Sequence, residues 1–550
     1  MPIIAKLLRA RTLQALALMV LAYLFLSTEA SAQRRLEVLA AVGPWPVASN
    51  PIIYDGRLWF SVSVKGRNHN SADLWSLDPQ TGDLQYERHL FSQDAGTPVI
   101  FQGLLYWPHE DSRLSLGYGA ISVTDGDTWG ELEIPTAKTF HLHHLIDWGG
   151  TLVAVTSAWQ AGLQTSDDGG ATWSAFYDHP TEAKRVSRLN SPAVVLGRLY
   201  FKLRDPAGTR LVRVTEHELA EIAQWPQTHF HSLTSFNSTL YGIVGRRGSA
   251  SIWKSSWKSG GRKSQRLAAA YGRGDPVDLY AGKDRIWALF AQTNGGYVAS
   301  SKDGNRWQIE ATFEGGTPHE LIVAPDQILI AGTGADGQAA IWGIKGATLK
   351  EASKGYRREI PVPFKLPPSD AIDWQQQSDR LKNALRTPAN FRNHGREGLR
   401  EVVRNMAALS PPPEFFANHL EAAMPDIKVA VIGGEAKIPA RRIGQWNLLW
   451  AMRSNARARV PPALLARPWE LAIRRSEKYF DPLLAALMTV SYNRQNDTET
   501  IATLINRLKS EQDPLWLKGD IIGVLTAVTG QKFGYKIDRW LAWWDRQRPD

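Results

Sequence analysis

The sequence predicts a seven-bladed β-propeller followed by an all-α domain. A short strand–turn–strand pattern occurs seven times, and successive copies start 47, 47, 47, 41, 46 and 42 residues apart. That spacing holds about four short strands, which is the unit of one propeller blade. Beyond about residue 353 the apolar residues change to helical periodicity. The predicted domains are a propeller at 33–353, a linker at 354–368 and a helical domain at 369–550.

The first 32 residues have the three-part layout of a secretory signal peptide. Basic residues precede an apolar run at 13–26, and Ala30-Ser31-Ala32 offers a cleavage site before Gln33. We therefore expect an exported protein, periplasmic or extracellular, with an uncleaved N-terminal membrane anchor as the alternative. The chain has no cysteine, which excludes disulfides, thiolate metal sites and a lipidated cysteine after the signal.

The propeller repeat has a turn residue, a variable residue, an aliphatic residue and a large apolar residue. A short apolar stretch precedes each turn, so each copy predicts a strand, a tight turn and a second strand. The seven copies begin at Gly56, Gly103, Gly150, Gly197, Ser238, Asp284 and Asp326.

The segment Ser166–Trp173, with the sequence SDDGGATW, resembles the bacterial neuraminidase repeat or Asp-box. Looser matches occur at Ser301–Trp307 and Val123–Trp129, each in a different repeat. We interpret the motif as a turn in which Asp accepts backbone hydrogen bonds, Gly supplies a positive φ and Trp packs into the blade. Proteins with this repeat are Asp-box propellers of the sialidase-like fold, and they include sialidases, some endoglucanases, photosystem assembly factors and sorting receptors.

The resemblance implies a fold and no catalytic residue. A sialidase carries an Arg-Ile-Pro segment near the start of its propeller, whereas the nearest strings here, Arg358–Pro361 and Lys437–Pro439, lie at or beyond the propeller's end. A general glycoside hydrolase needs two carboxyl groups a few ångströms apart. The linear sequence does not show which of the 54 acidic residues converge.

Polar residues recur at the start of the innermost strand of each blade. His141 and His229 stand two positions before His143 and His231, and strand alternation puts both members of a pair on one face. The column seven residues before each turn is Ser49, Gly96, His143, Asn190, His231, Val277 and His319, and the next column is Asn50, Thr97, His144, Ser191, Ser232, Asp278 and Glu320.

This ring predicts a polar funnel at the channel mouth. The residues expected to contact a ligand are His141, His143, Asn190, His229, His231 and His319. A divalent metal held by the three imidazoles of the first column is one alternative, and a solvated channel wall is the other. No cofactor is indicated by any motif.

The second domain is predicted to be helical and basic. The prolines of 361–368 exclude a helix and predict an extended linker or a strap along the propeller. The end of the chain, Leu525–Tyr535 and Trp540–Trp544, resembles the closing unit of bacterial HEAT-like helical repeat proteins. Trp540, Trp543 and Trp544 share one helix face and are predicted to be core residues.

Most of the net positive charge belongs to the helical domain, since residues 369–550 hold 27 Lys or Arg against 20 Asp or Glu. A basic patch could meet an anionic partner or a membrane surface, with a solvated helix face as the alternative. The densest cluster is Arg441, Arg442, Arg453, Arg457 and Arg459. Export argues against a nucleic-acid partner.

These observations predict an exported, non-catalytic binding or scaffolding protein. Its channel face would take a glycan, a peptide or a protein partner, and the helical domain would add a second surface. The alternatives are a glycoside hydrolase acting outside the cytoplasm and an assembly factor for an envelope complex.

Overall fold

The structure is a computed structural model. It describes residues 34–63, 72–110, 119–134, 141–157, 161–180, 187–216, 218–224, 230–255, 265–267, 274–349, 359–361, 370–386, 399–423, 448–453, 458–466, 482–511, 513 and 515–547. The predicted signal peptide, His229 and most of the predicted linker lie outside these residues.

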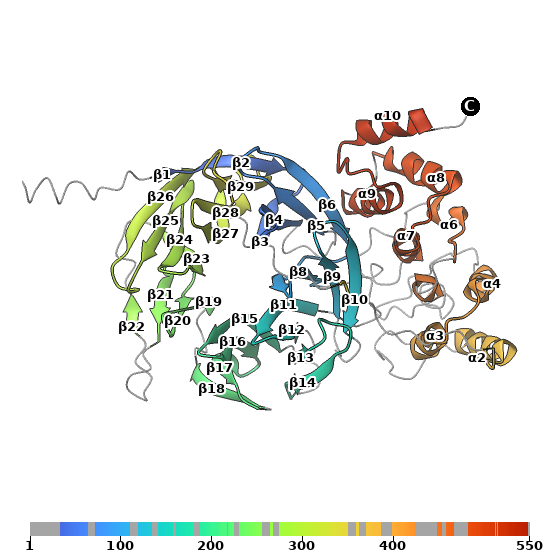
Figure 1. Ribbon diagram of the computed structural model, residues 1–550, viewed down its shortest axis with the longest axis horizontal. Coiled ribbons are helices and arrows are strands. Elements are labelled where there is room, and N and C mark those ends of the chain that lie inside the picture. Colours follow the sequence, from blue (N-terminus) through green and yellow to red (C-terminus); the bar gives the residue numbers. More distant parts are fainter. Residues whose placement is uncertain are drawn as a thin grey trace, which may run out of the picture.

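Seven β-sheets surround a central axis (Figure 1), which confirms the predicted seven-bladed propeller. Each of the first four blades is a meander of four antiparallel strands that runs outward from the axis. Blade one holds β3 (Val47–Tyr54), β4 (Arg57–Ser63), β5 (Ala72–Leu77) and β6 (Leu84–Leu90); blade two holds β7 (Val99–Phe101), β8 (Leu104–Pro108), β9 (Gly119–Thr124) and β10 (Trp129–Ile134). Blade three holds β11 (His141–Trp148), β12 (Thr151–Ser157), β13 (Gly162–Ser166) and β14 (Ser174–Asp178); blade four holds β15 (Arg188–Val195), β16 (Arg198–Asp205), β17 (Gly208–Val214) and β18 (Leu219–Gln224).

The last three blades follow the same order. Blade five holds β19 (Phe230–Phe236), β20 (Thr239–Val244), β21 (Ser251–Lys254) and β22 (Gln265–Leu267); blade six holds β23 (Asp275–Ala281), β24 (Ile286–Gln292), β25 (Gly295–Ser301) and β26 (Gln308–Glu314). Blade seven holds β27 (Thr317–Ala324), β28 (Gln327–Thr333) and β29 (Ala339–Gly343).

The outermost strand of blade seven comes from the start of the described chain. β2 (Glu37–Val42) pairs antiparallel with β29, and β1 (Arg34–Arg35) pairs parallel with β26 of blade six. The ring is therefore closed by two segments that are far apart in the sequence. The repeat pattern did not predict this closure, because β2 precedes the first copy of the pattern.

The turn at Ser166–Trp173 has the hydrogen bonds that the sequence predicts. Asp168 accepts from the backbone N–H of Thr172 at 2.9 Å, and Ser166 Oγ accepts from the N–H of Gly170 at 2.7 Å. Gly170 has a φ of +96°, and Trp173 is 8% exposed. These contacts fix the hairpin between β13 and β14, which supports a structural role for the motif.

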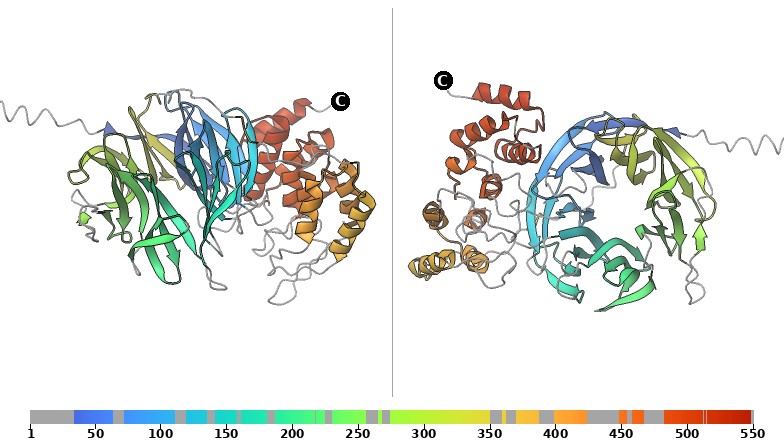
Figure 2. Two further views of the ribbon diagram at one scale, coloured as in Figure 1. Left: turned by 60° about the horizontal axis from the view of Figure 1, so that its bottom comes forward. Right: turned by 180° about the vertical axis from the view of Figure 1, so that it is seen from behind.

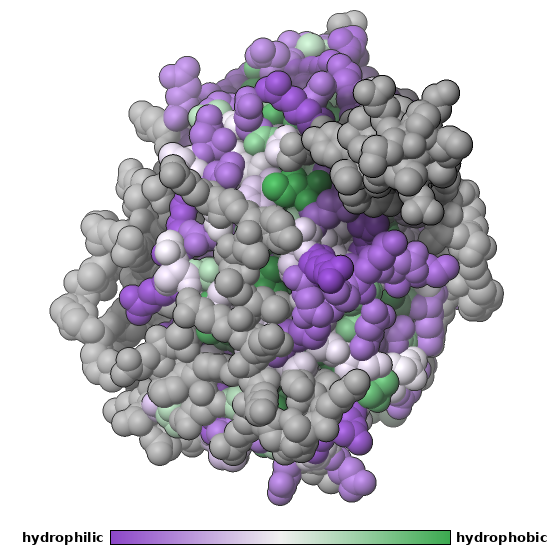
Figure 3. All heavy atoms as spheres, turned by 90° about the vertical axis from the view of Figure 1, so that its left-hand side faces the viewer, coloured by the Kyte–Doolittle hydropathy of each residue, from purple (hydrophilic) through white to green (hydrophobic). Residues whose placement is uncertain are grey.

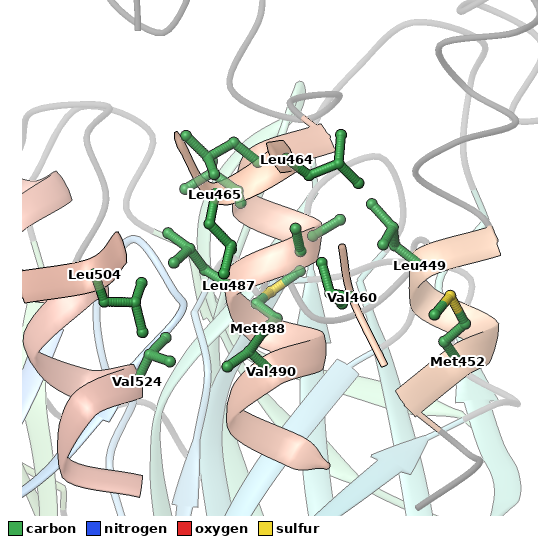
Figure 4. Packing of buried hydrophobic residues seen from close by; sticks show 14 of the residues in the cluster. Leu449, Met452, Val460, Leu464, Leu465, Leu487, Met488, Val490, Leu504 and Val524 are labelled. Atoms are coloured by element: carbon green, nitrogen blue, oxygen red, sulfur yellow. The ribbon is translucent and has the colours of Figure 1, made fainter. Parts of the chain in front are cut away.

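Beyond the propeller the chain is helical. The helices are α2 (Trp374–Arg386), α3 (Leu399–Ala408), α4 (Pro413–Ala423), α6 (Pro462–Ala466), α7 (Pro482–Tyr492), α8 (Thr498–Leu508), α9 (Leu515–Thr529) and α10 (Ile537–Gln547). Their apolar side chains form one large core (Figure 4). Trp540 and Trp544 are buried in it and Trp543 packs against it, as predicted. Within the described residues no helix has both the length and the apolar character to span a bilayer.

The helical domain stands beside the ring, against the outer edges of blades one and two (Figures 1 and 2). α9 packs along β6, the outer strand of blade one. Ile360, within the predicted linker, packs against the core between blades two and three, which agrees with a strap along the propeller. On the opposite side of the propeller, the described surface is mostly hydrophilic with a few separate apolar side chains (Figure 3).

His89 of β6 is buried between carboxylates from both domains. Its Nδ1 lies 2.7 Å from Asp73 Oδ1 on β5, and its Nε2 lies 2.6 Å from Asp520 Oδ1 on α9. Asp73 also accepts hydrogen bonds from Trp45 Nε1 at 2.6 Å and Tyr535 Oη at 2.7 Å. Since both ring nitrogens of His89 face acceptors, the arrangement favours the imidazolium, in which both nitrogens are donors.

Burial alone would lower the pKa of His89. The hydrogen bonds to Asp520 and Asp73 outweigh burial and raise the pKa above the ordinary value of 6.5. A histidine whose pKa is raised by folding stabilises the folded state fully below its unfolded pKa. That contribution is lost as the pH rises through the folded pKa.

Arg453 does not belong to a basic outer surface, so this part of the sequence interpretation is wrong. Its guanidinium pairs with Glu133 of β10 at 2.8 Å and lies 4.3 Å from the ring centroid of Tyr492. The physical reason is that its charge is neutralised by a propeller carboxylate at the domain contact, where Arg453 is 9% exposed. Arg459 pairs with Asp497 at the start of α8. Arg441, Arg442 and Arg457 lie outside the described residues.

The His89 contact predicts a pH-dependent stability. We expect the thermal unfolding midpoint of the full chain to fall as the pH rises from about 6.5 through the raised pKa of His89. His89→Gln should remove this fall, whereas His231→Ala in blade five should keep it. His89→Ala leaves Asp73 and Asp520 without their shared cation, so we expect a loss of about 3–5 kcal/mol at pH 6. An identical pH slope in the parent and His89→Gln would contradict the prediction.

The close approach of α9 to β6 depends on Gly523. A Cβ at this position would lie 2.3 Å from His89 Cβ, so a methyl group must displace α9 from the propeller. Alanine favours helix over glycine by about 1 kcal/mol, yet we expect Gly523→Ala to destabilise the chain by about 1–3 kcal/mol through overpacking. Lys518→Ala, on the same helix, is the control and should change the denaturation midpoint little. A stabilised Gly523→Ala chain would show that the domains are not tightly docked.

Candidate functional site at the channel mouth

The innermost strands carry a β-bulge at the place where the sequence shows its polar columns. The register shifts lie between Ser49 and Ile52, Leu142 and His144, Asn190 and Ala193, His231 and Thr234, Pro276 and Asp278, and Pro318 and Glu320. At three of these bulges a non-glycine residue has a positive φ: 54° at Asn50, 51° at Ser191 and 50° at Ser232. A bulge interrupts the hydrogen-bond ladder, so the polar groups around it need other partners.

Side chains of the second column supply these partners from the neighbouring blade. Glu320 Oε2 of blade seven accepts from the N–H of Asn50 in blade one at 2.6 Å. Asp278 of blade six accepts from Ser232 Oγ of blade five at 2.6 Å and from the N–H of Leu321 in blade seven at 2.9 Å. These carboxylates therefore connect adjacent blades.

His144 has the same role between blades two, three and four. Its Nδ1 lies 2.8 Å from Thr97 Oγ1, and its Nε2 accepts from the N–H of Ser191 at 3.3 Å. Burial, and then the positive charge of Lys202, lower the pKa of His144 to about 3, so the imidazole is neutral and Nε2 can act as an acceptor. Much of the polar wall is thus structural.

The structure brings His141 and His143 together. Their rings are stacked, with centroids 6.1 Å apart and planes 10° from parallel. His141 Nδ1 lies 2.9 Å from the backbone oxygen of Glu110, and His143 Nδ1 lies 3.8 Å from Glu110 Oε1. Burial, followed by the neighbouring His144 and His141, holds the pKa of His143 well below its usual range. Its Nε2 is buried and has no hydrogen-bond partner among the described residues.

Asn190 lies on blade four beside three cationic residues. It pairs directly with Lys202, and Arg188 pairs with Arg204 two positions away, so alternation puts all four side chains on one face of the sheet. Burial, and then the charges of Arg204 and Arg188, lower the pKa of Lys202 to about 8. In the part of the chain that the structure describes, none of the three cations has a carboxylate partner.

The other predicted histidines that the structure describes are His231 and His319. His231 pairs with Ile243 in blade five, and His319 Nε2 lies 3.2 Å from Thr333 Oγ1 in blade seven. Among the described residues no group of three His, Cys, Asp or Glu side chains could hold a metal ion. The described histidines therefore give no support to the predicted three-imidazole metal site.

Sequence reasoning missed Arg188, Lys202 and Arg204. The signal was present in the second half of β16 (RLYFKLRD), where Lys202 and Arg204 stand at alternate positions on either side of an apolar residue. Only the strand register shows that Lys202 lies opposite Asn190.

Comparison with known proteins finds solved structures of low similarity, and the propeller fold rests on the seven sheets of the structure itself. No family model matches the sequence, and no curated protein matches it. An ulvan lyase of polysaccharide lyase family 25 is 12% identical, with a TM-score of 0.40 over 58% of this chain and 98% of the lyase. The propeller domain of a Pyrococcus furiosus protease is 11% identical, with a TM-score of 0.29 over 48% of this chain and 98% of that domain.

A third similar structure is the extracellular domain of a putative hybrid two-component system from B. thetaiotaomicron. It is 13% identical, with a TM-score of 0.40 over 58% of this chain and 43% of that one. At these values the similarities carry no information on ligand or activity.

The inter-blade hydrogen bonds predict that a channel carboxylate is needed for stability. Asp278→Ala removes the acceptor of Ser232 Oγ and of the Leu321 N–H, so we expect a loss of about 2–4 kcal/mol in the free energy of unfolding. The matched control is Asp284→Ala in the exposed turn of the same blade, which should cost less than about 0.5 kcal/mol. Equal stability of the two variants in urea unfolding would show that the carboxylate does not hold the blades together.

Proposed function

We propose that this chain is an exported, non-catalytic binding or scaffolding protein whose channel mouth takes a glycan, peptide or protein partner. The proposal rests on a difference between two sets of polar groups at the channel mouth. One set forms hydrogen bonds between adjacent blades, and the other has no hydrogen-bond partner among the described residues. Glu320 and Asp278 are used as acceptors between blades, whereas His143 Nε2 and Lys202 Nζ have no hydrogen-bond partner among the described residues. Polar groups held in place without a partner are what a ligand can bind.

The placement of the domains supports the same proposal. The helical domain lies beside the ring, so its described helices do not cover the channel axis (Figures 1 and 2). Export is supported by the signal-peptide layout of residues 1–32. A glycoside hydrolase would need two carboxyl groups facing a substrate, whereas Asp278 and Glu320 hold backbone N–H groups of the next blade.

A glycan and peptide array, probed with the full chain, tests the proposal. We expect binding by the parent and at least tenfold weaker binding by His143→Ala, because the truncation removes the unpartnered imidazole. Arg306→Ala, on the exposed outer turn of blade six, is the control and should bind like the parent. Hits should then be incubated with the chain and analysed by mass spectrometry. Release of cleaved product would overturn the non-catalytic part of the proposal, and an array without any hit would overturn ligand binding.

A further inference from the structure

The cations of blade four and the histidines of blade three are electrostatically coupled across the boundary between the blades. His144 accepts a hydrogen bond from blade four through the Ser191 N–H at 3.3 Å. The positive charge of Lys202 lowers the pKa of both His144 and His143, and that of Arg188 lowers the pKa of His143. The two groups therefore belong to one site.

This site holds three cations and, beside His143, the carboxylate of Glu110. Arg188, Lys202 and Arg204 repel one another, and none has an acidic partner in the described part of the chain. The nearby His143 and His144 are neutral because their pKa values are lowered. Lys202 is half-buried, whereas Arg188 and Arg204 are exposed. Burial, and then the charges of Arg204 and Arg188, disfavour the ammonium form of Lys202, so a bound anion would stabilise that form.

We propose that this site is a subsite for the oxyanion of an acidic glycan, with a carboxylate or sulfate group bound by Lys202, Arg188 and Arg204 and a sugar hydroxyl bound by His143 Nε2. The proposal rests on the proposed function and specifies its ligand. Neutral His143 offers a buried acceptor to a hydroxyl donor, and the guanidinium and ammonium groups offer charge-assisted hydrogen bonds to the oxyanion.

The surroundings favour a sugar over an acidic peptide. The side chains that accompany the cations, Asn190, His141 and Glu110, provide both donors and acceptors for hydroxyl groups. The exposed large apolar residues of the described chain are Val38, Ile100 and Leu196, and none lies at this rim. Ile100 and Leu196 are next to the turns at the opposite end of the inner strands. Among the described residues, a peptide would find no exposed large apolar anchor beside the cations.

Isothermal titration calorimetry on the full chain tests the subsite. The probes are an oligosaccharide of uronic acid residues, a sulfated oligosaccharide, a neutral oligosaccharide of the same length and a poly-glutamate peptide, all at one ionic strength. We expect an acidic oligosaccharide to bind at least tenfold more tightly than the neutral one and than the peptide. The two acidic probes distinguish a carboxylate from a sulfate.

Matched variants assign the binding to the site. Lys202→Gln should lower the affinity for the acidic oligosaccharide at least tenfold. Lys202→Arg should retain most of that affinity because the charge remains. Lys302→Gln makes the same charge change on the exposed turn of blade six and should bind like the parent. Thermal unfolding of each variant verifies that it is folded.

The pH dependence gives an independent readout. The charged and titratable groups around Lys202 are Arg188 on β15, Arg204 on β16 and the neutral His143 and His144 on β11. His141 stacks on His143, and the carboxylate of Glu110 lies 3.8 Å from His143 Nδ1. Because the pKa of Lys202 is lowered to about 8, an anion that binds its ammonium form should bind more weakly as the pH rises through 8. Lys202→Arg should not show this decrease.

The outcomes separate the subsite from the proposed function. Equal binding of the acidic and neutral oligosaccharides, or unchanged affinity in Lys202→Gln, would overturn the subsite while leaving the binding function in place. Preferential binding of the poly-glutamate peptide would overturn the assignment to a glycan. Absence of binding by every probe, together with an empty glycan and peptide array, would overturn both.

Discussion

Backbone groups at the bulges of the inner strands must find partners outside their own sheet, and this need determines the chemistry of the whole channel. Unpaired buried amides are costly, and here the acceptors come from neighbouring blades, as when Glu320 binds Asn50 and Asp278 binds Leu321. The polar column is therefore largely committed to holding seven sheets in a ring. The polar groups that the ring does not use include His143 Nε2 and Lys202 Nζ, which have no hydrogen-bond partner among the described residues.

Local signals predicted the fold because each blade is built from short-range contacts. The turn copies at Gly56 and Gly103 mark hairpins whose strands are adjacent in the chain, and both glycines have the positive φ that such hairpins require. The sequence also predicted that His141, His143 and Asn190 lie near the start of innermost strands, and they lie on β11 and β15. It could not show that Lys202 lies opposite Asn190, because register across a bulge depends on which residue is left unpaired. The HEAT-like and Asp-box resemblances remain predictions.

The contact between the propeller and the helical domain could not be predicted from the sequence, and the reason is different. His89 and Asp520 are 431 positions apart, and neither has a feature that distinguishes it from a surface residue. Arg453 was interpreted as part of an exposed cluster, although it is buried against Glu133. Removing two charges from water costs free energy, and the attraction between them offsets this cost only when the geometry of the ion pair is good. Buried ion pairs of this kind therefore mainly fix the orientation of the helical domain on blades one and two. Their contribution to the free energy of unfolding is smaller.

The closure of blade seven by β2 also sets the order in which the chain can fold. Glu37 pairs with Gly343, so β2 has no partner strand until nearly the whole propeller has been synthesised. Contacts between such distant segments slow folding, because a long loop must close before the pairing is gained. Blades one to five can form as local meanders, and the ring becomes a single cooperative unit only with the last sheet.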